Sequence, residues 1–260
     1  MDILLYMVMT LLGFVGSFFS GLLGIGGAII NYPLLLFVPS TLGVAQFTGR
    51  EVAAISMFQV FFASLAGLIA FRKKGEKTIH NGLVLYMGTS ILLGSLAGGF
   101  GSRFLHGDVI NILYGVLAII AVVLMLIPTR VKQADPEGVI TFNKWIAAIS
   151  AFIVGIVSGV VGAGGAFILI PIMLTVLKIP TRITIASSLA IVFISAVGGV
   201  IGKITAGPFP IIPTIFVVLG SLIGAPLGSR VSSKINVRFL RYALVILISL
   251  TAVKVWSSIL

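Results

Sequence analysis

Two long stretches without a charged residue constrain the fold of this chain more than any other feature. One runs from Ile3 to Gly49 and the other from Trp145 to Leu177. A helix needs about 20 apolar residues to cross the hydrocarbon core of a bilayer, and both stretches exceed that length. Charged residues make up only 9% of the chain, whereas a soluble domain carries about a quarter. The sequence therefore predicts an all-α polytopic membrane protein.

Apolar runs between charges predict the individual helices. Two of the predicted helices, 27–38 and 166–177, would be about 18 Å long at about 1.5 Å per residue. They are too short for a core of about 30 Å. The full set is 3–22, 27–38, 51–71, 80–102, 109–128, 144–160, 166–177, 183–203, 211–229 and 238–258.

A glycine-rich motif occurs twice, directly before the two short helices. Ser20–Ala28 reads SGLLGIGGA and Ser158–Ala166 reads SGVVGAGGA, and Pro33 and Pro171 follow at matching distances. Glycine weakens a helix and permits close backbone approach. Breaks in corresponding places of two halves indicate the binding site of a transporter. Each motif therefore predicts a helical hairpin that breaks near mid-depth and returns to the side it came from.

The similarity of the two halves extends beyond the hairpins. Ser64–Gly67 resembles Ser195–Gly198, which pairs Ser56 with Ser187, and Gly101-Ser102-Arg103 resembles Gly228-Ser229-Arg230. Each half is then a broken hairpin followed by three transmembrane helices. The predicted organisation is a first repeat at 1–130, a cytoplasmic linker at 131–143 and a second repeat at 144–260.

The distribution of Lys and Arg predicts that the repeats have inverted topology. With loop 72–80 in the cytoplasm and re-entrant hairpins, thirteen of the 17 cations lie inside and four outside. If each broken helix crossed once, the split would be nine to eight. Cytoplasmic loops carry an excess of Lys and Arg, so the inverted arrangement is favoured. It places both termini outside the cytoplasm.

The glycine breaks are expected to bind an anion. The first amides of each short helix are free, and the helix dipole is positive there. Such ends bind anions readily, and nearby serine, asparagine and glutamine side chains could add hydrogen bonds. The candidate substrate-binding residues are Ser20, Gly24, Gly26, Gly27, Asn31, Ser56, Gln59, Ser158, Gly162, Gly164, Gly165 and Ser187.

Other small and polar residues have structural interpretations. Small residues four apart let membrane helices pack closely, which predicts packing seams at Gly94, Gly98 and Ser102 and at Gly220, Gly224 and Gly228. Arg50 and Glu51 could gate a pathway, but an interfacial ion pair is the simpler interpretation. Pro33 and Pro171 are interpreted as kinks or helix-end residues.

Absences narrow the function further. No acidic residue lies in a predicted helix core, cysteine is absent, and no catalytic or metal-binding cluster stands out. We therefore expect no enzyme activity, no cofactor and no metal site. The net charge of +11 comes from cations at helix ends, where lipid headgroups are contacted, so nucleic acid is not an expected partner.

The doubled Ser-Gly-x-x-Gly-x-Gly-Gly-Ala followed by a proline resembles the sulfite exporter TauE/SafE family, also called the 4-toluene sulfonate uptake permease family. The resemblance covers essentially the whole chain and carries over to Gly21, Gly24, Gly26, Gly27, Pro33, Gly159, Gly162, Gly164, Gly165 and Pro171. It implies transport of sulfite, organosulfonates or related sulfur oxyanions across the bacterial inner membrane. Ile25 and Ala163 interrupt the glycine run that many members have, which leaves the substrate size open.

The leading hypothesis is a secondary transporter of a small sulfur-containing oxyanion that works by alternating access. A passive anion channel and a non-transporting membrane scaffold are the alternatives. The expected partners are a small anionic substrate and membrane lipids, with a homodimer as an open option. The expected location is the inner membrane.

Overall fold

The computed structural model describes residues 2–23, 28–72, 79–126 and 142–232, and six single positions between 242 and 257. Within the four ranges the chain forms nine α-helices and a short 3-10 helix, without a strand. The helices are α1 (Asp2–Leu23), α2 (Ala28–Thr41), α3 (Gly49–Arg72), α4 (Asn81–Gly101), η1 (Ser102–Phe104), α5 (Gly107–Leu126), α6 (Lys144–Val161), α7 (Ala166–Thr175), α8 (Thr181–Ala206) and α9 (Ile211–Ser232).

These bounds confirm the all-α prediction and nine of the predicted helices. The two short helices, α2 and α7, have 14 and 10 residues. Pro33 and Pro171 lie inside α2 and α7, at the same distance from the helix start, so neither is a helix-end residue. The predicted linker at 131–143 and last helix at 238–258 lie largely outside the described residues.

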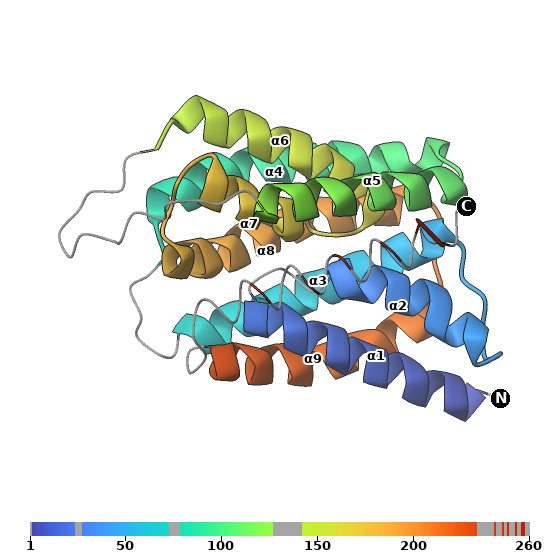
Figure 1. The fold of residues 1–260 in the computed structure, drawn as a ribbon. Coiled ribbons are helices and arrows are strands. Elements are labelled where there is room, and N and C mark those ends of the chain that lie inside the picture. Colours follow the sequence, from blue (N-terminus) through green and yellow to red (C-terminus); the bar gives the residue numbers. More distant parts are fainter. Residues whose placement is uncertain are drawn as a thin grey trace.

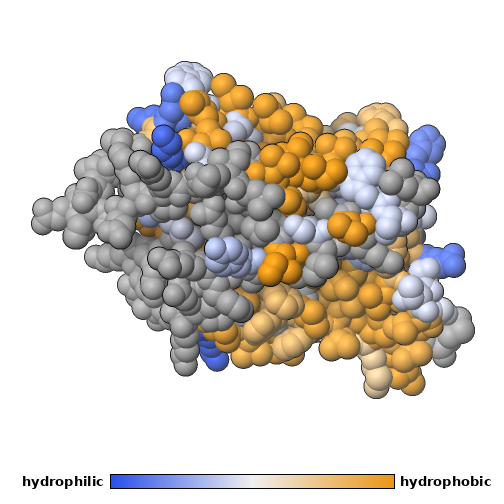
Figure 2. All heavy atoms as spheres, in the orientation of Figure 1, coloured by the Kyte–Doolittle hydropathy of each residue, from blue (hydrophilic) through white to orange (hydrophobic). Residues whose placement is uncertain are grey.

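The surface of the helices fits a bilayer. Among the described residues, six helices are long and apolar enough to cross a membrane, by length and composition. Figure 2 shows hydrophobic residues over the middle of one face and hydrophilic residues towards the two ends of the helices. This distribution matches a hydrocarbon core flanked by two aqueous boundaries.

Helices of the two predicted repeats pack against each other in a reciprocal pattern. Helix α1 lies along α9, and α6 lies along α4 (Figure 1). Helix α3 contacts α8 and α9, and α8 contacts α3 and α4. The first helix of each predicted repeat thus packs on the fourth helix of the other repeat, and α3 contacts α8 between the two pairs.

Glycine contacts fix the directions of these helices. Gly94 meets the Phe152 carbonyl and Gly98 meets the Ile156 carbonyl, so α4 and α6 run parallel. In the same way, Gly224 meets the Phe14 carbonyl and Gly228 meets the Phe18 carbonyl, which makes α1 and α9 parallel. Gly220 meets the Thr10 carbonyl. The two glycine rows are therefore the packing seams predicted from the sequence.

The central helices run in opposite directions. Met57 of α3 contacts Gly199 of α8, while Gly67 of α3 contacts Leu189 of α8. Loop 207–210 then turns the chain, and α9 packs back along α3. Helix α8 runs parallel to α4, since Leu92 meets Gly198 and Gly99 meets Gly202. Helices α1 and α6, which begin the two hairpins, therefore run in opposite directions.

The packing register refines the correspondence between the halves. Ile156 and Phe18 occupy equivalent places before the two motifs, and they meet Gly98 and Gly228. The contacts therefore equate Gly98 with Gly228, whereas the sequence match equated Gly101 with Gly228. Three residues are nearly one helical turn, so both alignments place small residues on the same face.

Candidate functional site

The second glycine motif interrupts the chain between α6 and α7. Gly162, Gly164 and Gly165 have φ angles of 79°, 64° and 78°, a left-handed region that side chains with a Cβ rarely adopt. Gly162 ends α6, where its amide donates to the Ser158 carbonyl at 2.8 Å, and Gly165 is the N-cap of α7. The predicted break is therefore present in this half, and each of its glycines is required by the backbone.

The break lies against the middle of the central helices. A Cβ on Gly162 would overlap the Ala53 carbonyl of α3, so the two backbones touch. A Cβ on Gly164 would lie 2.5 Å from Val60 and 3.2 Å from Val192. Val60 and Val192 are close to the midpoints of α3 and α8, so the break sits near the centre of the helix bundle.

The break presents amides that have no acceptor among the described residues. Gly164, Gly165 and Ala166 are buried, and their N–H groups donate to no residue that the structure describes. They stand at the N-terminus of α7, where the helix dipole is positive. Buried N–H groups are nearly always paired, so this cluster is suited to an anionic ligand.

A group of buried polar side chains lies in the first half. Within the described chain, the Ser20, Asn31, Ser56 and Gln59 side chains are buried and keep at least one polar atom without a hydrogen-bond partner. Both polar atoms of Asn31 are unpaired. Leaving such groups unsatisfied costs about 1–3 kcal/mol each. Four side chains with unpaired polar atoms in one region indicate that a ligand or ordered water binds there.

Contacts show how this group is held together. The Asn31 side chain of α2 fills the space beside Gly16 of α1, where a Cβ would stand. Gln59 of α3 donates through Nε2 to the Gly13 carbonyl and to Ser17 Oγ of α1, both at 3.1 Å. Helices α1, α2 and α3 pack on one another. The amide side chains are thus wedged among three helices, with Gln59 Oε1 unpaired.

Ser56 connects the polar group to the second break. Residues three and four apart lie on one face of a helix, so Ala53, Ser56 and Val60 share a face of α3. Ala53 meets Gly162 and Val60 meets Gly164. The unpaired Ser56 hydroxyl is therefore on the face of α3 that packs against the break between α6 and α7.

The corresponding residues of the second half are already paired or apolar. Ser158 Oγ donates to the Gly155 carbonyl at 3.1 Å, and Ser187 Oγ accepts the His80 amide at 3.0 Å. Leu169 stands where the first half has Asn31. Ser187 lies near the start of α8, and its hydroxyl serves the start of α4 instead of the break. Gly24, Gly26 and Gly27 lie outside the described residues.

The sequence missed the role of two cations. Arg50 forms no ion pair with Glu51: it donates to the Leu105 carbonyl at 2.6 Å and the Arg103 carbonyl at 3.1 Å. Glu51 instead accepts the Thr48 amide at 2.8 Å. Lys203, which composition places among the loop cations, is buried in the last turn of α8. The signal for this was its position directly after about 20 apolar residues, inside the length of one span.

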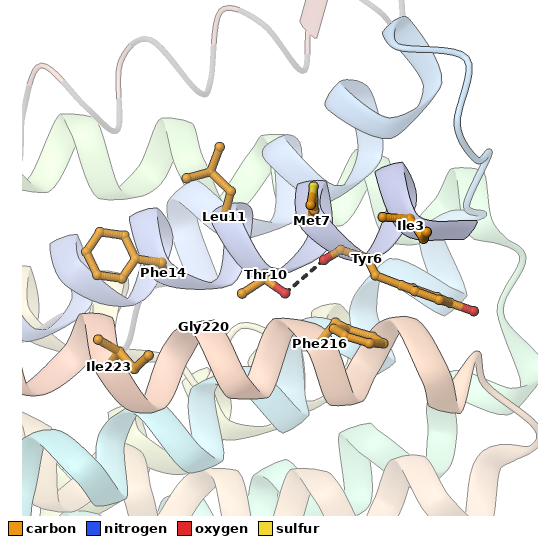
Figure 3. A pocket seen from close by; sticks show the side chains of 9 residues that line it. All are labelled: Ile3, Tyr6, Met7, Thr10, Leu11, Phe14, Phe216, Gly220 and Ile223. Atoms are coloured by element: carbon orange, nitrogen blue, oxygen red, sulfur yellow. Dashed lines mark hydrogen bonds between the residues drawn. The ribbon is translucent and has the colours of Figure 1, made fainter. Parts of the chain in front are cut away.

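A separate cavity among the described residues is not near these groups. It has a volume of about 560 Å³ and lies between α1 and α9, where Tyr6, Phe14, Phe216 and Ile223 line it. Figure 3 shows these side chains along the two helices, with Thr10 bonded to the Tyr6 carbonyl at 2.8 Å. Its largely apolar lining suits contact with lipid, and none of its lining residues carries a charge that would attract an anion.

The apolar helices and the buried polar interior define a multi-pass membrane protein. The model of the sulfite exporter TauE/SafE family matches residues 9–255, and the chain belongs to this family. Two relatives from Bacillus subtilis, the probable membrane transporter proteins YunE and YdhB, are 21% and 27% identical. The alignments cover 90% of both chains for YunE, and 87% of this chain and 89% of the relative for YdhB.

A probable membrane transporter protein from Methanocaldococcus jannaschii is 26% identical over 89% of this chain and 90% of its own. No solved structure matches the chain. Family and relatives therefore agree on a membrane transporter.

Proposed function

We propose that this protein is a secondary carrier of a small sulfur-containing oxyanion, sulfite or an organosulfonate, in the bacterial inner membrane. The observation that carries the proposal is the cluster of unpaired amides at Gly164, Gly165 and Ala166. The unpaired Ser56 hydroxyl lies on the facing side of α3. Donors at a helix N-terminus, in a site without a carboxylate, favour an anion.

Inverted repeats and alternating access form the second part of the proposal. The opposite directions of α1 and α6 and the reciprocal packing of α1 on α9 and α6 on α4 support them. Two hairpins that begin at opposite sides and meet at one site can expose it to either side in turn, as inverted repeats do in other carriers. The predicted position of both termini outside the cytoplasm belongs to the same proposal.

Flux measurements in liposomes test the carrier against its alternatives. Purified protein is reconstituted with unlabelled sulfite inside, and uptake of ³⁵S-sulfite is followed. A carrier gives saturable uptake that is faster with internal sulfite than without. A channel gives uptake that neither saturates nor responds to internal sulfite. Absence of flux for sulfite, sulfate, thiosulfate and an aromatic sulfonate would favour the scaffold.

A matched pair of glycine variants tests the site itself. Gly164 and Gly43 have φ angles of 64° and 67°, but a Cβ on Gly43 meets nothing within 4 Å. Alanine at either position pays about 1–2 kcal/mol for the left-handed backbone. Only Gly164→Ala also crowds the break, because its Cβ would lie 2.5 Å from Val60 and 3.2 Å from Val192. We expect Gly164→Ala to lose transport and Gly43→Ala to keep it; equal transport by both would refute the site.

A leucine at Gly165 would be a less selective test of the site. The structure argues for the smaller alanine instead. A Cβ on Gly165 would lie 3.0 Å from Val154 and 3.1 Å from Ser158 Oγ, and its φ angle is 78°. A leucine at this position would therefore strain the fold as well as fill the site.

A further inference from the structure

A small polar cavity lies where the start of α3 meets the end of α8. It has a volume of about 120 Å³ and is lined by Arg50, Ala54, Ser102, Lys203, Ala206 and loop 207–209. One water molecule occupies about 30 Å³ in liquid water, so the cavity has room for a few waters. It could hold one compact oxyanion, but not a sulfonate with an aromatic ring.

Lys203 brings a positive charge into this cavity. Its side chain is 3% exposed, and Nζ donates to the Val160 carbonyl at 2.6 Å and to Ser102 Oγ at 3.0 Å. Ser102 Oγ in turn donates to the Gly99 carbonyl at 2.6 Å. An ammonium group has three N–H donors, and these two bonds leave one for a ligand.

Arg50 adds a second positive charge at the same cavity. Its Nη2 donates to the carbonyls of Arg103 and Leu105 at 3.1 Å and 2.6 Å, and its other guanidinium donors have no partner among the described residues. Neither cation is paired with a carboxylate among the described residues, and no acidic side chain lines the cavity. Lys203 is buried, burying an unpaired charge is costly, and a bound anion would offset that cost.

The cavity is next to the second glycine break. Val160, whose carbonyl binds Lys203, is in the last turn of α6. Ala54 of the cavity wall follows Ala53, whose carbonyl touches Gly162. An anion in the cavity is thus separated from the break by the end of α6 and one turn of α3.

We propose that the Arg50–Lys203 cavity is a separate oxyanion-binding site, which the anion occupies on its way to or from the glycine break. The identity of the ligand, a compact oxyanion such as sulfite, rests on the proposed transport function. Arg50 and Lys203 bind it by charge-assisted hydrogen bonds, which are stronger than neutral ones. The site selects against bulky sulfonates by its volume.

Anion titrations of purified protein test this site without relying on transport. The Tm is measured against sulfite and sulfate at constant ionic strength, with an aromatic sulfonate for comparison. We expect Arg50→Gln and Lys203→Met to raise the half-saturating concentration of sulfite about 10-fold or more, the value of one charge-assisted hydrogen bond. The matched control is Arg103→Gln, because that exposed guanidinium stacks on Phe100 and Phe104 at 4.0 Å and 4.4 Å.

Lys203→Met also removes a bond to the end of α6, so two other variants guard against misfolding. Arg50→Gln changes an exposed residue, and Lys203→Arg keeps the positive charge and should bind sulfite more tightly than Lys203→Met. The proposal is overturned if Arg50→Gln leaves the half-saturating sulfite concentration unchanged. It is also overturned if Arg103→Gln raises that concentration as much as Arg50→Gln does. So does an aromatic sulfonate that binds as well as sulfite.

An Asn31→Leu variant separates this inference from the proposed function. It alters the polar group beside α1 and leaves the cavity intact. If Asn31→Leu abolishes the anion-dependent rise in Tm while Arg50→Gln preserves it, the cavity is not the binding site and the glycine site stands. If the Arg50 and Lys203 variants weaken binding while the wild type carries no sulfite, the cavity stands and the carrier proposal fails.

Discussion

The two halves of the chain pack in a reciprocal pattern but differ in how their buried polar groups are paired. In the first half, Ser20, Asn31, Ser56 and Gln59 carry buried polar atoms without partners among the described residues. In the second half, the side chains at equivalent positions are paired or apolar, and the described break supplies main-chain amides instead. A site built from side chains of one half and backbone of the other would hold an anion in one orientation. The predictions below test this division.

The largest effect is expected at the packing seams, where the halves should behave alike. A leucine side chain at Gly98 would overlap the Ile156 carbonyl, and one at Gly228 would overlap the Phe18 carbonyl. These are backbone atoms, so a change of side-chain rotamer cannot relieve the overlap. We expect each to cost more than about 3 kcal/mol, the upper end for overpacking, and to remove folded protein from the membrane. Size-exclusion profiles and Tm of detergent-solubilised protein measure this.

Gly101→Leu is the control for the seams. Gly101 belongs to the same helix as Gly98, and a Cβ there meets nothing within 4 Å. It should therefore keep the wild-type Tm within a few degrees. If Gly101→Leu were as damaging as Gly228→Leu, the register read from the contacts would be wrong and the sequence match would be right.

The next largest effect is expected when Asn31 and Leu169, which differ between the halves, are exchanged. Asn31→Leu places the second-half residue in the first half, with similar volume. Loss of a hydrogen bond to a charged ligand is worth about 1.5–3 kcal/mol, so sulfite transport at subsaturating concentration should fall about 10- to 100-fold. Stability should not fall, because an unsatisfied buried amide is removed. Flux and Tm together measure this.

Leu169→Asn is the reciprocal change. It buries an amide that has no designed partner, which costs about 1–3 kcal/mol, and we expect a lower Tm with no gain in sulfite affinity. If Asn31→Leu lowered the Tm and left flux unchanged, the amide would be structural, and the division between the halves would have to be abandoned.

Alanine substitutions of Ser56 on α3 and Ser187 on α8 should affect different properties, the first sulfite affinity and the second stability. Ser56→Ala removes an unpaired hydroxyl, so the half-saturating sulfite concentration should rise about 2- to 10-fold at unchanged Tm. Ser187→Ala removes the acceptor of the His80 amide, so stability should fall by about 0.5–1.5 kcal/mol at unchanged half-saturation. The opposite result would place the site at the start of α8.

Much of the fold could be predicted because it depends on local patterns. Apolar runs between charges gave the helix bounds within a few residues, and glycines four apart gave the seams that join α4 to α6 and α1 to α9. The second break was also predicted, since three glycines in five residues cannot sustain a helix. Each of these features depends on residues close together in the sequence.

Features that depend on distant partners were missed. Ser187 resembled Ser56 in sequence, but the His80 amide, 107 residues away in the chain, takes its hydroxyl. Lys203 resembled a loop cation, yet the Val160 carbonyl and Ser102 bind it inside the bundle. No periodicity within α8 reports either contact. The hydrogen-bond partner of a buried polar group is set by tertiary packing, which the pattern of a single helix does not contain.

The smallest expected effect compares the serines that open the two motifs. Ser20 Oγ is buried without a partner among the described residues, so Ser20→Ala should raise the half-saturating sulfite concentration about 2- to 5-fold through loss of one neutral hydrogen bond. Ser158 Oγ is bound to the Gly155 carbonyl one turn earlier, a local bond that a helix hardly needs. Ser158→Ala should therefore leave half-saturation within about 1.5-fold of the wild type and the Tm nearly unchanged. Concentration-dependent ³⁵S-sulfite uptake separates the two. Equal shifts in both variants would mean that the second motif supplies side chains as well as amides, and that the two breaks contribute to the site in the same way.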